Sequence, residues 1–226
     1  MNIVMVNGSP RRDGSTAKLL CAAVDGAKSV AGENVNVERI DVYSKPYMGC
    51  KSCLACKLPA MQGKGCVVTD EMTADIKKAE AADVLLMGTP VYFFSESSGF
   101  KAFYERLLYP YKSYLPQVKT LFPRQIQAGI IYTMNMAQES FENASPYLEK
   151  PSICQPTVKL AAELVGTCEA MVVHGTLRTP NFERYVIDVE TERVKAEKVL
   201  QTFPAQLQAA YELGAKLARQ AMAAAV

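Results

Sequence analysis

Four of the seven cysteines lie close together in residues 49–66, GCKSCLACKLPAMQGKGC. They are spaced as Cys50-x2-Cys53-x2-Cys56-x9-Cys66, so three thiols can face one centre and the fourth can return to it from a short loop. Iron–sulfur clusters use four cysteine thiolates in compact runs of this kind. A zinc ion would take the same four ligands in a tetrahedral array. A loop of thiols without metal is the third interpretation, and the residue types leave all three open.

A second segment suited to chemistry is NGSPRRDGST, residues 7–16, which follows a short apolar run and leads into a predicted helix. The N-terminus of a helix attracts anions because its backbone N–H groups are free and its dipole end is positive. The segment adds hydroxyl groups, a glycine that allows close backbone approach and two guanidinium groups, at Ser9, Arg11, Arg12, Gly14, Ser15 and Thr16. It matches neither the Walker A pattern nor the dinucleotide fingerprint. We interpret it as a phosphate-binding loop; the alternative is a helix-capping turn that binds nothing.

A third segment, GTPVYFF, covers residues 88–94 and follows another apolar run. A planar redox ring needs a flat apolar surface and backbone donors for its polar edge. This segment can supply both, through Pro90, Val91, Tyr92, Phe93 and Phe94. The alternative is that the aromatic side chains belong to the core and pack under the next helix.

The elements that must position these segments alternate along the chain. Apolar runs predict strands at residues 2–6, 35–43, 83–88, 127–133 and 169–175. Apolar residues at helical spacing predict helices at residues 15–32, 70–82 and 98–109, and a long Ala- and Leu-rich helix is expected after Pro204. This alternation indicates an α/β fold, a flavodoxin-like doubly wound five-stranded parallel sheet of order 2-1-3-4-5 with helices on both faces. Such sheets bind ligands beyond the carboxyl ends of their strands.

Two stretches fall outside this alternation, residues 109–125 and 143–156, and each contains three prolines. We interpret both as ordered excursions that cover the site or form an oligomer contact, with surface loops of no function as the alternative. Glu96 and Arg106 are expected to be surface charges. The single histidine, His174, is expected to be structural or solvent-facing. The three isolated cysteines are expected to be ordinary core or surface thiols, at Cys21, Cys154 and Cys168.

The composition is that of a globular protein, with 49% hydrophobic and 21% charged residues, and we expect one domain over residues 1–226. A net charge of +2 gives no sign of a nucleic-acid or membrane partner. No apolar run approaches the ~20 residues of a membrane span. The first residues, MNIVMVNGSP, lack the features of a secretion signal, so we expect a cytoplasmic protein. Disulfides are uncommon there, and seven is an odd number of cysteines for a fully paired framework.

Three stretches that follow one another in order carry a resemblance to a known family: NGSPRRDGST, GCKSCLACK…GCVVTDEM and GTPVYFFSESSGFKAFYERL. The chain resembles the flavodoxin-like NAD(P)H-dependent FMN reductases and, within them, the iron–sulfur flavoproteins. The resemblance implies FMN as the cofactor. It implies a phosphate loop at Ser9, Arg11, Ser15 and Thr16, a ring segment at Pro90, Val91, Tyr92 and Phe93, and a third flavin-contacting loop at Thr133 and Asn135. The iron–sulfur flavoproteins have a shorter gap before the last cysteine, which KLPAMQGKG widens here.

The function that the resemblance implies is an FMN-dependent oxidoreductase. It would move electrons from NAD(P)H through FMN to a quinone, a flavin or a protein acceptor, and a [4Fe-4S] cluster would convert the two-electron step into one-electron transfers. A homodimer or homotetramer is expected from the same resemblance. Two other classes stay open: a non-catalytic flavin or iron–sulfur electron carrier, and a zinc-stabilised binding module without flavin.

Overall fold

The computed structural model describes residues 1–142, 154–179 and 181–224. Its centre is a parallel sheet of β1 (Asn2–Asn7), β2 (Asn36–Asp41), β3 (Val84–Tyr92), β5 (Ile126–Thr133) and β6 (Gly166–Val173). The strand order is β2-β1-β3-β5-β6, and the short β4 (Ser95–Glu96) pairs antiparallel with the end of β3. The doubly wound, flavodoxin-like α/β fold predicted from the sequence is therefore confirmed, with β4 as an addition.

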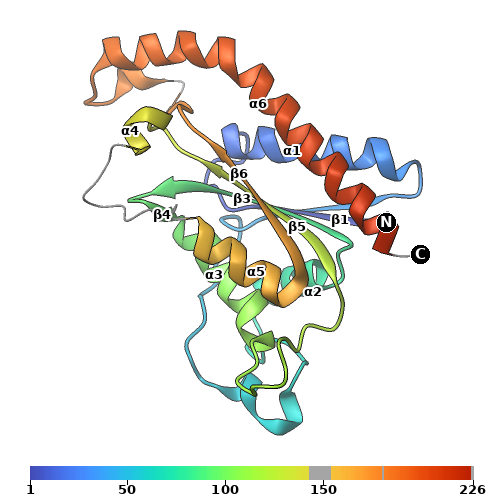
Figure 1. The fold of residues 1–226 in the computed structure, drawn as a ribbon. Helices are drawn as coiled ribbons and strands as arrows, with labels where there is room; N and C mark the ends of the chain where they lie inside the picture. Colours follow the sequence, from blue (N-terminus) through green and yellow to red (C-terminus); the bar gives the residue numbers. More distant parts are fainter. Residues whose placement is uncertain (143–153, 180, 225–226) are drawn as a thin grey trace.

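Helices cover both faces of the sheet (Figure 1). One face carries α1 (Ser15–Ala31) and α6 (Val189–Ala224), and the other carries α2 (Met72–Glu80), α3 (Ser98–Leu108) and α5 (Gln155–Val165). A short helix, α4 (Gln138–Glu142), follows β5. Single turns of 3-10 helix lie at Ala55–Lys57, Pro59–Met61, Tyr109–Tyr111 and Phe182–Arg184.

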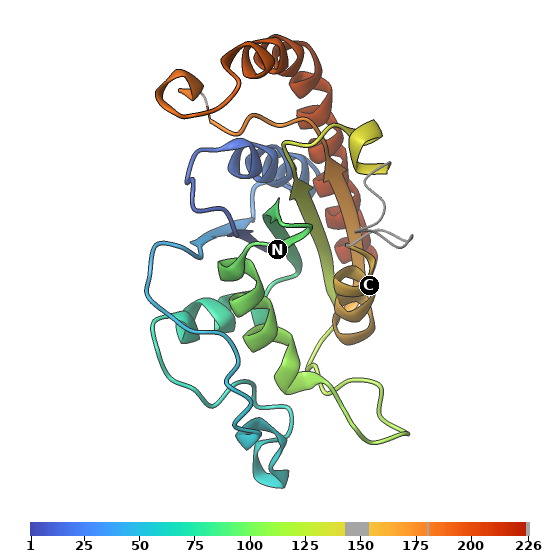
Figure 2. The ribbon, with the colours of Figure 1, turned by 90° about the vertical axis from the view of Figure 1, so that its left-hand side faces the viewer.

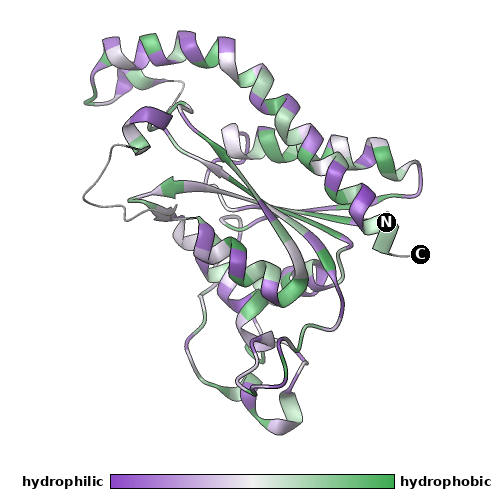
Figure 3. Cartoon of the chain, viewed as in Figure 1, coloured by the Kyte–Doolittle hydropathy of each residue, from purple (hydrophilic) through white to green (hydrophobic). Residues whose placement is uncertain are grey.

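The inner strands are mainly apolar because helices cover both of their faces. All eight residues of β5 are buried, as are the first seven residues of β3. Figure 3 shows hydrophobic residues along the central strands and on α1, and a mixture of hydrophilic and hydrophobic residues along α6. The predicted stripe on α1 is confirmed, since its apolar members are all buried, at Leu20, Ala23, Val24 and Ala27.

The last helix differs from the prediction. We expected it to begin after Pro204, but α6 begins at Val189 and contains Pro204 within it. Proline removes one intrahelical hydrogen bond and bends a helix without necessarily ending it. The two halves of α6 accordingly run in different directions, and the first half extends over α4 and the end of β6 (Figure 1).

The predicted excursions are only partly described. Residues 109–125 begin with the Tyr109–Tyr111 turn and fold back through a bridge between Lys112 and Thr120. Of the excursion predicted at 143–156, residues 143–153 lie outside the described part of the chain. No helix in the described ranges has both the length and the apolar character needed to cross a membrane.

The contact between α1 and α6 depends on two glycines. A β-carbon at Gly26 would overlap the backbone of Tyr211, and one at Gly214 would overlap the backbone of Ala23. Small buried residues continue this contact along both helices, at Ala23, Ala27, Ala210 and Ala218. The two helix backbones therefore touch directly, and the contact leaves no room for a side chain at either glycine.

We expect Gly214→Ala to destabilise the protein by about 1–3 kcal/mol, the usual cost of overpacking, although alanine is the better helix former. Urea unfolding measures this difference. Ala209→Ser, at an exposed position of the same helix, is the control and should change stability by less than about 0.5 kcal/mol. A Gly214→Ala protein as stable as the parent would mean that the helices are not in direct backbone contact.

Candidate functional site

A cleft of about 900 Å³ opens at the carboxyl ends of β1, β3 and β5. The residues predicted from the sequence to bind FMN all line it: Ser9, Arg11, Gly14, Ser15, Thr16, Pro90, Val91, Tyr92, Phe93, Thr133 and Asn135. They come from three segments that are far apart in the sequence, each at or just after the carboxyl end of a strand. The fold brings them together because parallel strands place their following loops at one edge of the sheet.

The loop after β1 is held in shape by its own hydrogen bonds. The backbone N–H of Ser9 donates to the Asn7 side chain at 3.1 Å, and the N–H of Arg11 donates to the Ser9 hydroxyl at 3.2 Å. Helix α1 starts at Ser15, directly after Gly14, and no side chain caps it. The first N–H groups of α1 are thus open toward the cleft, an arrangement that suits an anion.

The start of α1 and the end of β5 are joined by a buried contact between two threonines. The hydroxyl oxygens of Thr16 and Thr133 lie 2.7 Å apart. Farther along, the Asn135 side chain donates to the Thr176 carbonyl at 2.9 Å, and the guanidinium of Arg11 donates to the carbonyl of Arg178. A fourth loop, which follows β6, therefore closes the cleft.

The loop after β3 turns its aromatic side chains outward. Tyr92 is 45% exposed and Phe93 is fully exposed, so these two side chains do not belong to the core. Phe93 and Phe94 have φ angles of 47° and 59°, which are unusual for residues other than glycine. The turn that they form joins β3 to β4 and presents an apolar surface to the cleft.

One residue that we expected to be a surface charge is buried beside this turn. The side chain of Glu96 is only 4% exposed. It accepts hydrogen bonds from the hydroxyls of Thr157 at 2.6 Å and Tyr132 at 3.3 Å, and it pairs with Lys101 at 3.4 Å. Burial alone would raise the pKa of Glu96, but the hydrogen bond from Thr157 and the charge of Lys101 hold it below its usual value.

The sequence interpretation also missed the contribution of residues 176–178, which line the cleft after β6. No motif marks them, because the resemblance is only general in this part of the chain. Their position after a strand's carboxyl end was the one available signal.

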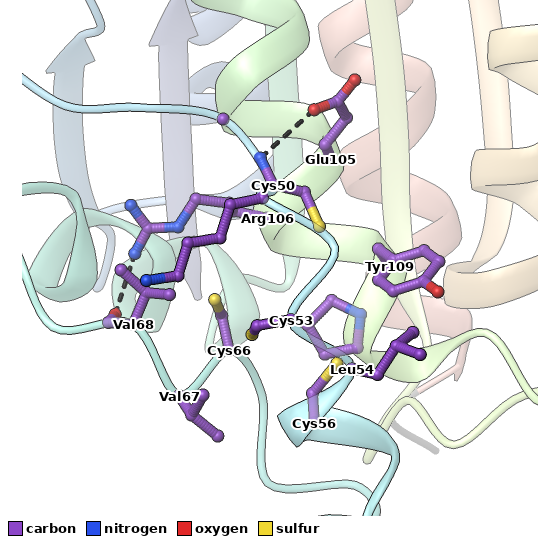
Figure 4. Close-up of a pocket in the computed structure, with 13 residues that line it drawn as sticks. Cys50, Cys53, Leu54, Cys56, Cys66, Val67, Val68, Glu105, Arg106 and Tyr109 are labelled. Atoms are coloured by element: carbon purple, nitrogen blue, oxygen red, sulfur yellow. Dashed lines mark hydrogen bonds between the residues drawn. The ribbon is translucent and has the colours of Figure 1, made fainter.

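The four clustered cysteines line a separate pocket between their own loop and the end of α3: Cys50, Cys53, Cys56 and Cys66 (Figure 4). Figures 1 and 2 show this loop at the end of the molecule away from α6. Cys56 is buried, whereas Cys50 and Cys53 are exposed. Burial raises the pKa of the Cys56 thiol, Lys57 works against this, and the other three thiols raise it further because they are close by. The isolated Cys21 is exposed.

Arg106, which we also expected at the surface, closes this pocket. Only 1% of its side chain is exposed. Its guanidinium donates to the carbonyls of Met48 at 3.4 Å and Val68 at 2.9 Å, and it pairs with Asp70. One arginine therefore holds the chain just before Cys50 and just after Cys66.

Whether a metal ion or a metal cluster fits this pocket depends on the side chains that could bind it. Within the described ranges, no group of three or more His, Cys, Asp or Glu side chains gathers closely enough to hold one metal ion. A single zinc ion needs all its sulfurs about 2.3 Å away, whereas a cluster spreads its four thiolates over separate irons. Arg106 Nε is buried in this pocket without a hydrogen-bond partner. Four thiols and an unused N–H donor fit a sulfur-rich group better than a single ion.

We expect Arg106→Met to cost about 3 kcal/mol of stability, near the low end for breaking a buried ion pair, because Asp70 is 22% exposed. Arg124→Met is the matched control. Arg124 also joins a carboxylate, Asp83, and a backbone carbonyl, but 40% of its side chain is exposed, so its loss should cost under about 1 kcal/mol. Equal unfolding free energies for the two variants would mean that Arg106 does not hold the cysteine loop in place.

Comparison with known proteins identifies the family of this chain. A model of a family described as NADPH-dependent FMN reductase matches residues 1–149. An iron-sulfur flavoprotein of Methanocaldococcus jannaschii is 32% identical over 106 residues, which are 47% of this chain and 51% of that protein. The alignments span about half the length of each curated relative.

Solved structures agree with the fold. An NAD(P)H:quinone oxidoreductase from Methanothermobacter marburgensis superposes with a TM-score of 0.61 at 16% identity, over 96% of this chain and 98% of the other. An azoreductase from Bacillus anthracis gives a TM-score of 0.63, also at 16% identity, over 96% and 99% of the two chains. Since the family match covers well over half of the sequence, the chain belongs to the NADPH-dependent FMN reductase family.

Proposed function

We propose that this protein is an FMN-dependent oxidoreductase that takes electrons from NAD(P)H. The observation that carries the proposal is the single cleft lined by all eleven residues nominated for FMN. Its volume, about 900 Å³, lies in the range of ligand pockets. When bound, FMN supplies hydride and electron transfer, and the protein's part is to hold and orient it.

The cleft offers a partner for each part of the cofactor. The phosphate would bind at the start of α1, where free N–H groups and the hydroxyls of Ser9 and Ser15 supply donors. The ring would lie along Pro90–Phe93, and the exposed aromatic residues would keep water from one face of it. Thr133, the last residue of β5, and Asn135, in the loop after it, would also contact the ring.

We further propose that the four cysteines hold a [4Fe-4S] cluster. The names of the curated relatives, iron-sulfur flavoproteins, support this, as does the pocket's donor set. Zinc and a metal-free loop are the alternatives. Quinone is the proposed acceptor, since a quinone oxidoreductase is among the structural neighbours, with a flavin or a protein as alternatives.

A homo-oligomer would help the two sites to cooperate. The turn of Phe93 and Phe94 leads into the start of α3, and the cysteine pocket lies at the helix's end. The eleven residues of α3 span about 16 Å. In a homodimer or homotetramer, the cysteine pocket of one copy could lie nearer the cleft of another. A cytoplasmic location stays a prediction.

The first test is a titration of flavin-free protein with FMN. We expect binding at one FMN per chain, and Ser15→Ala should raise the Kd about tenfold through loss of one charge-assisted hydrogen bond. Ser29→Ala is the control in the same helix, since the Ser29 hydroxyl donates to Gly26 O away from the cleft. Protein that takes up no FMN would refute the flavoprotein proposal and favour a binding module.

The metal proposal is tested separately by anaerobic purification with iron, sulfide and zinc assays. We expect about four irons per chain, and Cys53→Ser should lose iron while it retains FMN. Cys21→Ser, at an exposed thiol of α1, should keep both. Zinc in place of iron, or neither metal, would replace the cluster by one of the alternatives. Failure to oxidise NADPH with any acceptor would favour an electron carrier.

A further inference from the structure

A second pocket of about 430 Å³ adjoins the flavin cleft and shares Val91, Asn135 and Arg178 with it. We call it the side pocket. Its walls are mainly apolar, and they include Val91, Phe93, Phe94, Met134 and Phe141. Pockets of this size and character accept small aromatic molecules. A molecule bound here would lie next to the place proposed for the flavin ring.

Two cations line the side pocket, and no carboxylate does so among the residues that the structure describes. They are Arg178, from the loop after β6, and Lys195, from the first half of α6. Each places a side-chain nitrogen 3.2 Å from the same atom, Asn135 Oδ1. Two positive charges that share one neutral acceptor repel each other, so an anion between them would be favoured.

The carboxylates near Lys195 lie outside the side pocket. Glu192 accepts a hydrogen bond from Lys195 at 3.0 Å and is itself only 3% exposed. Hydrogen bonds with Thr191 lower the pKa of Asp188, and the charge of the nearby Lys195 lowers it further. Neither carboxylate lines the pocket, and Arg178 has only the neutral Asn135 oxygen as side-chain partner among the interactions of the described residues. Glu192 therefore pairs with Lys195 and holds it in place, while Arg178 has no ion-pair partner among the described residues.

We propose that the side pocket selects an electron acceptor that combines an aromatic ring with an acidic group, such as a carboxylate or sulfonate. This inference rests on the proposed function. The apolar walls would hold the ring, and Lys195 with Arg178 would bind the acidic group. The balanced reaction is quinone plus NAD(P)H plus one proton, giving hydroquinone plus NAD(P)⁺. Two electrons and one proton arrive as hydride from NAD(P)H, and the second proton comes from solvent.

The second cation reaches the side pocket from the first half of α6. Lys195 lies in the half of the helix that precedes Pro204, the half that extends over α4 (Figure 1). A helix that began after Pro204 would leave Arg178 as the only cation among the described residues that line the side pocket.

The test compares the reduction of 1,4-naphthoquinone with that of 1,4-naphthoquinone-2-sulfonate by FMN-loaded protein. For Lys195→Gln we expect the KM of the sulfonate to rise about tenfold, because one charge-assisted hydrogen bond is lost. The KM of the uncharged quinone should change far less. Lys195→Arg keeps the charge and should restore selectivity. Lys198→Gln, at an exposed lysine of the same helix, should behave as the parent. Circular dichroism and flavin content confirm that each variant is folded.

Three outcomes would overturn the inference. An equal effect of Lys195→Gln on both quinones would make Lys195 a structural residue only. No effect on either quinone would mean that the pocket does not recognise the acidic group. A raised KM for NADPH, with both quinones unchanged, would assign the cations to a phosphate of the donor. If the parent protein reduces neither quinone, the proposed function fails instead.

Discussion

The close approach of β1 and β3 at their carboxyl ends is the contact on which the candidate site depends. The backbone N–H of Gly8 donates to the carbonyl of Gly88 at 2.7 Å, and the Ser97 hydroxyl donates to the carbonyl of Gly8 at 2.5 Å. A β-carbon at Gly8 would lie 2.7 Å from the Gly88 oxygen and 2.8 Å from the β-carbon of Phe100. Only glycine lets the loop after β1 touch β3 and α3 together, and this contact sets that loop beside the turn of Phe93 and Phe94.

Helix α3 connects this contact to the cysteine pocket at the other end of the molecule. Its N-cap residue, Ser97, accepts a hydrogen bond from the N–H of Phe100 at 3.3 Å while its hydroxyl donates to the loop after β1. Its last turns provide Glu105, which accepts from the N–H of Cys50 at 3.3 Å, and the buried Arg106. A closely packed helix is a rigid spacer, so the cleft and the cysteine pocket have a fixed separation within one chain.

The sequence predicted what local pattern and family motifs encode. The strands, the buried stripe of α1 and the eleven cleft residues predicted from the sequence follow from such signals. It failed where burial depends on a distant partner. Arg106 is buried by its interaction with Asp70, 36 residues away, and Glu96 by its contact with Thr157, 61 residues away. A charged residue in a single sequence looks like a surface residue until its partners are known. The start of α6 was also predicted wrongly, because a proline bends a helix without necessarily ending it and α6 continues through Pro204.

These buried charges stand next to the strained parts of the backbone. In the described ranges, the residues other than glycine with positive φ are Ser52, Leu54, Phe93 and Phe94, and they fall in the cysteine loop and the aromatic turn. Each such conformation costs about 1–3 kcal/mol and persists only where the surroundings enforce it. Glu96, two residues after Phe94, ties the aromatic turn to α5 and β5. The ammonium group of Lys57 donates to the carbonyls of Pro110 and Lys112, and Arg106 holds both ends of the cysteine loop. Glu96 and Arg106, which were predicted to be surface charges, are thus among the groups that hold the two candidate sites in shape.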